Sequence, residues 1–256
     1  MLKTTKEKIE EIKTNGYQID FGNVFNHAFE NYKKIALYAG LMIFVFAILL
    51  GFLAAGIVIS TFGVSALNQK ILEDLRVENF TGLHLAIYLI LGILFNCLLV
   101  PFLAGLIKMA HSAEKDEEFH VSTVFQYYKN PYFQELVISA FIITIFSIGL
   151  SEMLKLVGIE IIGALLSAVI SFFTFLTIPL IIFGNLKAID ALKSSMIIVS
   201  KQPLVLLGLI IVSRIASIVG FIGCCIGIFF TIPFIYSMYY VIYISIIGID
   251  SENEWE

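Results

Sequence analysis

The chain has 256 residues, of which 59% are hydrophobic and only 14% are charged, with a mean hydropathy of +0.94. Soluble domains are about 45–50% apolar and about 25% charged, and a soluble fold of this length has too little interior to hide so much apolar surface. The composition therefore predicts a membrane protein. The net charge of −4 and the scattered lysines exclude a nucleic-acid-binding protein, which needs a concentrated basic face.

A polar segment, residues 1–16, opens the chain with alternating lysines and glutamates and ends in the turn-forming pair Asn15-Gly16. The next stretch, residues 21–32, is termed the first amphipathic segment. Its apolar side chains recur at helical spacing: Phe21, Val24, Phe25, Ala28, Phe29 and Tyr32. Its polar side chains, His27 and Asn31 among them, lie opposite. Such a helix is expected to lie flat on the lipid headgroups with its aromatic face in lipid.

Six apolar stretches follow, at about residues 35–60, 83–107, 132–151, 159–184, 203–221 and 226–248. Because about 20 apolar residues cross the hydrocarbon core as a helix, each stretch is predicted to be a transmembrane span. Residues 64–75, between the first two spans, carry a weak apolar stripe that predicts a surface helix on the far side of the membrane.

The amphipathic pattern recurs before the third and fifth spans. Residues 121–128 form a second amphipathic segment, 100 residues after the first, so that Val121 and Phe125 take the places of Phe21 and Phe25. Residues 186–201 form a third, in which Lys193 intrudes on the apolar side. The predicted fold is an all-α polytopic membrane bundle of six spans, built as three hairpins that each follow a cytoplasmic amphipathic helix.

This pattern divides the chain into a polar N-terminal segment, a membrane domain and an acidic tail. The predicted bounds are residues 1–16, 17–249 and 250–256, with three repeats in the membrane domain at about 20–107, 119–184 and 185–248. Each repeat carries a proline in its second span, at Pro101, Pro179 and Pro233. Proline removes a backbone donor and kinks a helix, so three matching prolines predict a shared kink, although prolines are common in membrane helices generally.

Lysine and arginine counts predict the orientation of the spans. With six spans both termini share a side, and that side collects twelve lysines, whereas the other side has only Lys70, Arg76 and Lys155. Positive residues accumulate on the cytoplasmic side of membrane proteins. Both termini and the three amphipathic segments are therefore predicted to be cytoplasmic.

Arg214 is the charged residue that stands out within a span. It lies eleven residues beyond Pro203, which at roughly 1.5 Å per residue places it about 16 Å deep, near the centre of a core about 30 Å thick. Glu160 is the first candidate partner and Glu152 the second, and Asn96 is a further candidate hydrogen-bond acceptor. Two interpretations stay open: a structural ion pair between hairpins, or an anion or lipid-headgroup site lined by Arg214.

Weak motifs give the chain a resemblance to a bacterial membrane-protein family. They are a Phe-x-x-Val-x-x-x-Ala start at Phe21, an Ala-x-x-x-Ser joint at Ala191 and a Gly-x-x-x-x-x-Pro exit ending at Pro233. In these the chain resembles the six-span membrane domain fused to some glycerophosphodiester phosphodiesterases, and stand-alone, largely uncharacterised inner-membrane relatives. The resemblance implies a bacterial inner-membrane location. It does not imply phosphodiesterase activity, because the catalytic barrel has no counterpart in the chain.

Sequence motifs for catalysis, cofactors or metals are not found, so an enzyme is not expected. The acidic run Glu114, Asp116, Glu117 and Glu118 is interpreted as a solvated loop rather than a cation site. The favoured function is a structural or scaffolding protein of the inner membrane, in envelope or lipid homeostasis. The alternative is a transporter or channel for a small or amphiphilic solute, with a site at the kinked repeat interface around Arg214. Membrane lipids, and other membrane proteins, are the expected partners.

Overall fold

A computed structural model describes residues 4–62, 82–118, 120–156, 158–222 and 226–249, and all regular structure in these ranges is helical. The helices are α1 (Thr5–Asn15), α2 (Phe21–Phe62), α4 (Gly82–Glu114), α5 (Val121–Phe125), α6 (Tyr132–Leu156), α7 (Glu160–Thr174), α8 (Thr177–Ile182), α9 (Ala188–Lys201), α10 (Pro203–Val219), α11 (Gly227–Thr231) and α12 (Pro233–Ile246), with 3-10 turns at Gln126–Tyr128 and Gly220–Ile222. The surface helix predicted at residues 64–75 and the acidic tail lie outside the described residues.

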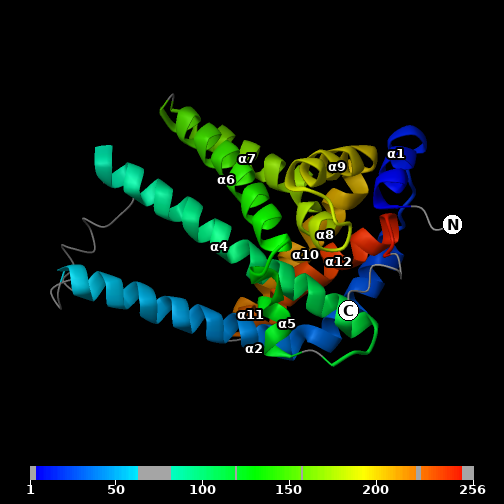
Figure 1. Cartoon of the computed structure of the whole chain (residues 1–256), viewed down its shortest axis with the longest axis horizontal. Helices are drawn as coiled ribbons and strands as arrows, with labels where there is room; N and C mark the ends of the chain where they lie inside the picture. The colour runs from blue at the N-terminus through cyan, green and yellow to red at the C-terminus, as the bar shows by residue number, and fades with distance from the viewer. Residues whose placement is uncertain (1–3, 63–81, 119, 157, 223–225, 250–256) are drawn as a thin grey trace.

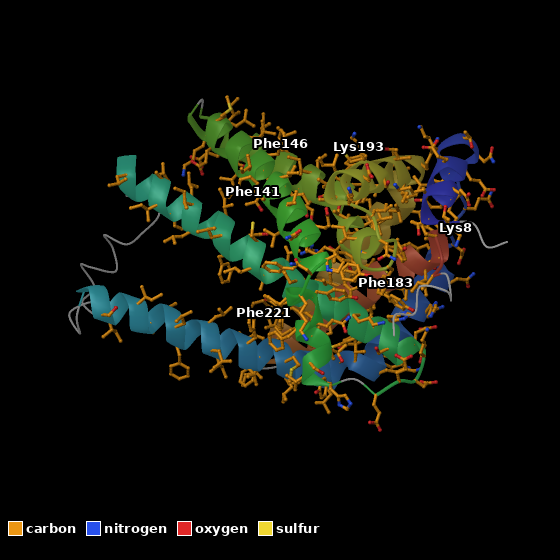
Figure 2. All side chains as sticks on the ribbon, viewed as in Figure 1. Lys8, Phe141, Phe146, Phe183, Lys193 and Phe221 are labelled. Atoms are coloured by element: carbon orange, nitrogen blue, oxygen red, sulfur yellow. The ribbon has the colours of Figure 1, made fainter. Side chains whose placement is uncertain are left out.

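Within the ranges just given, six helical stretches are long and apolar enough to cross a membrane: Phe21–Ile57, Leu85–Glu114, Tyr132–Lys155, Glu160–Ile182, Pro203–Ile222 and Gly227–Ile246. The predicted all-α polytopic bundle is therefore confirmed. Large apolar side chains face outward along these helices. Phe141 and Phe146 of α6, for example, point away from the bundle and are 48% and 67% exposed (Figure 2), which suits a surface in contact with lipid.

The helices converge at one end of the molecule and spread apart at the other. In Figure 1, α8, α9, α12 and α1 gather at the right, whereas α2, α4 and the α6–α7 hairpin diverge toward the left. The buried core follows this arrangement, since Leu106, Leu180 and Tyr243 are almost fully buried at the converging end, while Leu49 and Phe52 of α2 are exposed. We call the two regions the compact end and the spread end.

The first amphipathic segment is not a separate helix lying flat on the membrane, as the sequence predicted. It forms the first turns of α2, which runs without a break from Phe21 to Phe62. Residues 23–39 contain no glycine or proline that would end the helix before the apolar span begins. Its aromatic face is also partly covered by protein, while Phe21 and Phe29 remain 40% and 42% exposed. Phe25, Phe29 and Tyr32 all pack against Phe234 of α12, with ring centroids 5.4 to 6.1 Å apart.

The other two amphipathic segments are separate elements, and all three dock in a related way. The second, α5 with its 3-10 turn, packs on α4; the third, α9, packs on α8; and the first packs on α12. Each therefore lies on the second span of the predicted repeat that precedes it, with the first segment returning to the last span. The third segment buries Ser195 and Ile198, so it is a core helix on one face.

The N-terminal helix α1 is docked, although its sequence suggested no apolar stripe. A capping box between Thr4 and Glu7 starts the helix, and Ile9 and Ile12, three residues apart, are 5% exposed. Helix α1 packs on α9. Two side-chain hydrogen bonds strengthen this contact, from Lys201 Nζ to the Lys13 carbonyl at 2.7 Å and from Tyr17 Oη to the Ile198 carbonyl at 3.1 Å.

The three prolines differ in their effect on the helices. Pro101 lies inside an uninterrupted α4, whereas Pro233 begins α12 just after α11 ends, and Pro179 lies in α8, just beyond the break that ends α7. Near two of them a tyrosine satisfies the carbonyl three residues before the proline: Tyr128 Oη donates to the Leu98 carbonyl at 2.7 Å, and Tyr32 Oη donates to the Phe230 carbonyl at 3.1 Å. Near Pro179, Ser195 Oγ donates to the Phe173 carbonyl at 2.7 Å. Carbonyls near a proline kink need such donors in lipid.

We expect Gly105→Ala to destabilise the protein, because a Cβ at Gly105 would collide with the backbone of Val124 in the second amphipathic segment. Over-packing of this kind costs about 1–3 kcal/mol. Gly92→Ala is the matched control in the same helix, since a Cβ there meets nothing within 4 Å. Thermal unfolding in detergent should show a lower midpoint for Gly105→Ala and an unchanged or higher midpoint for Gly92→Ala. Equal midpoints would contradict the docking of α5 on α4.

Candidate functional site

A cavity of about 430 Å³ lies among the membrane-spanning helices, bounded by α4, α6, the α7–α8 break and α12. Its volume falls within the range of about 300–1,000 Å³ typical of ligand sites. Apolar side chains such as Leu89, Ile143 and Ile178 form much of the wall. Phe175, in the break between α7 and α8, also lines the cavity, so the interruption of the fourth span shapes one side of it.

Hydroxyl groups on the wall differ in whether they have a protein partner. Ser139 and Thr174 donate to carbonyls one turn earlier in their own helices, at Leu136 and Ile170, each at 2.8 Å. Thr177 is 1% exposed, and its hydroxyl is the one buried side-chain polar atom in the described residues that has no hydrogen-bond partner. An unsatisfied buried hydroxyl costs about 1–3 kcal/mol. Thr177 is therefore poised to bond a molecule in the cavity.

Two of the residues predicted from the sequence reach this cavity. Asn96 lines it directly from α4. Arg214 reaches it through Tyr239: the arginine Nη2 donates to the Tyr239 hydroxyl at 3.0 Å, and Tyr239 lines the cavity. Because the Tyr239 oxygen accepts a hydrogen bond from arginine, the tyrosine O–H proton is left free to donate to an acceptor bound in the cavity.

The predicted partnership of Arg214 with Glu160 or Glu152 is wrong. Neither carboxylate forms an ion pair with Arg214 in the described part of the chain, and the partner is the neutral hydroxyl of Tyr239. The reason is helix adjacency, since α10 packs on α12, α11 and α2, whereas α7 packs on α6 and α9. The side chain of Arg214 is exposed, although the residue lies within a helix long and apolar enough to span a membrane. The two glutamates lie at the two sides of the turn that joins α6 to α7.

The acidic run after α4 is more than the solvated loop that the sequence predicted. Glu114 Oε1 lies 2.8 Å from His27 Nε2, and Asp116 accepts a hydrogen bond from Lys34 Nζ at 2.6 Å. Asn31, between them on the same face of α2, is also buried. The face of the first amphipathic segment that was expected to be solvated therefore docks on α4, which sequence periodicity could not reveal because the partners are about 80 residues away.

Metal and cofactor sites were also considered. In the described ranges no group of three or more His, Cys, Asp or Glu side chains could hold a metal ion. Cys97 is buried in α4 against the Val137 carbonyl and is a free thiol. No known protein family, functionally characterised protein or solved structure matches the chain.

A double-mutant cycle tests the bond between Arg214 and Tyr239. Tyr239→Phe removes the acceptor of the guanidinium and should destabilise the protein, whereas Tyr239→Phe in an Arg214→Met background should cost much less. The expected coupling is about 0.5–1.5 kcal/mol, the range of polar pairs within membrane proteins. Equilibrium unfolding in detergent measures it. Strictly additive effects of the two substitutions would show that the pair is not formed.

Proposed function

We propose that the protein binds an uncharged amphiphile, taken from the bilayer, in the cavity between α4, α6, α8 and α12, and that it does so without catalysis. The observation that carries this proposal is the hydroxyl of Thr177, which is buried at the cavity wall and has no partner in the described residues. Protein interiors leave few such groups unsatisfied. A ligand hydroxyl or ester oxygen is the natural partner for it.

The wall supports an uncharged polar group attached to an apolar body. Within the described residues no Asp, Glu, Lys or Arg lines the cavity, and the polar groups that do are an amide and several hydroxyls. A buried charge would need a counter-charge or dense hydrogen bonding. An amphiphile with hydroxyl or ester groups could instead bond Asn96, Thr177 and Tyr239 while its hydrocarbon lies against Ile143 and Ile178.

The cavity favours the handling of an amphiphilic solute over a purely structural role. Discontinuous helices commonly shape the substrate sites of transporters, and the break between α7 and α8 lies beside Phe175 at the cavity wall. The break between α11 and α12 lies near Arg214, since Thr231 at the end of α11 donates to the Ser217 carbonyl of α10 at 2.6 Å. Both breaks are places where the bundle can bend to admit or release a ligand.

A scaffolding role is the second candidate, and the spread end favours it. Leu49, Phe52, Leu53 and Ile57 of α2 are between 58% and 75% exposed, and their helical spacing places them on one side of the helix. Apolar helices without protein neighbours offer surface to other membrane proteins. We further propose that the protein resides in a bacterial inner membrane with cytoplasmic termini, which the distribution of lysines supports.

Thr177→Val tests the binding proposal, with Thr174→Val as a matched control at the same cavity, because the Thr174 hydroxyl is already bonded to its own helix. The probe is a diacylglycerol that carries a photoreactive group in one acyl chain. We expect Thr177→Val to lower its affinity about tenfold, equivalent to about 1.4 kcal/mol, and to leave the ligand-free protein as stable or more stable. Thr174→Val should label like the wild type. If the two variants label equally, Thr177 is not the ligand's partner.

The proposed orientation is tested by cysteine labelling in a background that lacks the native cysteines. A thiol placed at Lys155, in the last turn of α6, should react with a membrane-impermeant reagent applied from outside. A thiol at Lys193, which lies at the outer edge of α9 (Figure 2), should react only after the membrane is opened. The opposite pattern would reverse the assigned orientation.

A further inference from the structure

A second cavity, of about 500 Å³, lies at the compact end, where α4 ends and α6 begins. Three lysines from three different stretches line it: Lys108 of α4, Lys115 of the loop that follows, and Lys129 just before α6. The one acidic residue among the described lining residues is Glu117. The cavity wall therefore carries an excess of positive charge, and we call it the basic pocket.

Two members of the acidic run, Glu114 and Asp116, do not compensate Lys108 or Lys129, because they pair with side chains of α2. Glu114 is bonded to His27 and Asn31, and Asp116 is bonded to Lys34, all on α2. In the described part of the chain neither Lys108 nor Lys129 has a carboxylate within ion-pair distance. The ammonium groups of Lys108 and Lys129 therefore make the pocket a site of positive potential, which attracts an anion.

The rest of the wall supplies hydrogen-bond donors on one side and apolar surface on the other. Gln126 and Asn130 contribute amide groups, and the ring of His111 is held by a hydrogen bond of 3.2 Å between Nδ1 and the Tyr240 hydroxyl. Ile182 and Phe183 form the apolar side; Figure 2 shows Phe183 among the helices of the compact end. The pocket is thus lined by cationic and amide groups and also by apolar side chains that could contact a hydrocarbon chain.

We propose that the basic pocket binds a phosphate group, carried by an anionic phospholipid or by a small soluble phosphate ester. Lysine ammonium groups and amide N–H groups are donors that phosphate oxygens accept. Basic pockets between transmembrane helices at the cytoplasmic side are typical sites for phospholipid headgroups, and the lysines lie on the side predicted to be cytoplasmic. Ile182 and Phe183 would contact the start of an acyl chain. This site is separate from the intramembrane cavity and does not depend on the function proposed for it.

Native mass spectrometry of the full-length protein in detergent tests the proposal, with phosphatidic acid as the probe and diacylglycerol of the same chains as the probe without phosphate. The test variant is Lys108→Gln/Lys129→Gln. The matched control is Lys187→Gln/Lys193→Gln, which removes the same charge from exposed positions of the same side outside the pocket. Lys108→Arg/Lys129→Arg keeps the charge and reports on folding. Glycerol 3-phosphate, added as a competitor, distinguishes a soluble ligand from a lipid.

We expect the glutamine test variant to bind phosphatidic acid at least tenfold more weakly than the wild type. The arginine variant should bind within about twofold of the wild type because it keeps the positive charge, and the control should do so because its two lysines lie outside the pocket. Binding of diacylglycerol should be the same in all variants. Competition by glycerol 3-phosphate at the affinity of the lipid would identify a soluble phosphate ester as the ligand; its failure to compete would identify the lipid. Equal loss in the control and test variants, or no loss in the test variant, would overturn the proposal.

Discussion

The buried side chain of Asn31 joins three helices that are far apart in the sequence. It is 2% exposed; its amide donates to the Ala110 carbonyl of α4 at 2.8 Å and to Glu114 at 3.2 Å, and its carbonyl accepts from Ser237 of α12 at 2.8 Å. A polar group that is buried away from water must find all its partners within the protein. Asn31 therefore fixes where α2, α4 and α12 meet, and a slip of any of the three would leave it unsatisfied.

The rest of the compact end follows from this junction. His27 and Lys34 lie on the same face of α2, one turn to either side of Asn31, and each bonds an acid at the end of α4. On the next face of α2, Phe25 and Phe29 pack on Phe234 of α12. The first turns of α2 are therefore held on two faces, by α4 and by α12. Glu114 is the last residue of α4, and Asp116 lies in the loop that follows, directly after Lys115.

Both proposed sites depend on this organisation. The intramembrane cavity lies toward the spread end, where α4 leaves α12 and runs beside α6, so the helices no longer fill the space between them. The basic pocket lies at the compact end, where the pairing of Glu114 and Asp116 with α2 leaves Lys108 and Lys129 without carboxylate partners. The junction of α2, α4 and α12 at Asn31 thus organises the compact end by polar bonds. The spread end is apolar, and the intramembrane cavity lies toward it.

Local patterns were enough to predict the six spans, because length and hydropathy are properties of one stretch of sequence. They also located a proline in the second span of each predicted repeat, and they identified Asn96 and Arg214 as polar residues within spans. They did not predict which helices pack against each other, and so which side chains meet. Arg214 bonds Tyr239 rather than Glu160, and Asn31 is buried although it lies on a polar face of its helix. Thr177 could not be singled out from local pattern, because its lack of a hydrogen-bond partner is recognised only once its surroundings are known.

The claim that the cavity holds an amphiphile is tested most directly by a cryo-electron microscopy map of the full-length protein in native membrane lipid. We predict elongated density that is not protein between α4, α6, α8 and α12, with its polar end within hydrogen-bonding distance, about 2.5–3.2 Å, of Thr177 Oγ1. A cavity closed by repacked side chains, or one filled only by separate water molecules, would contradict the claim.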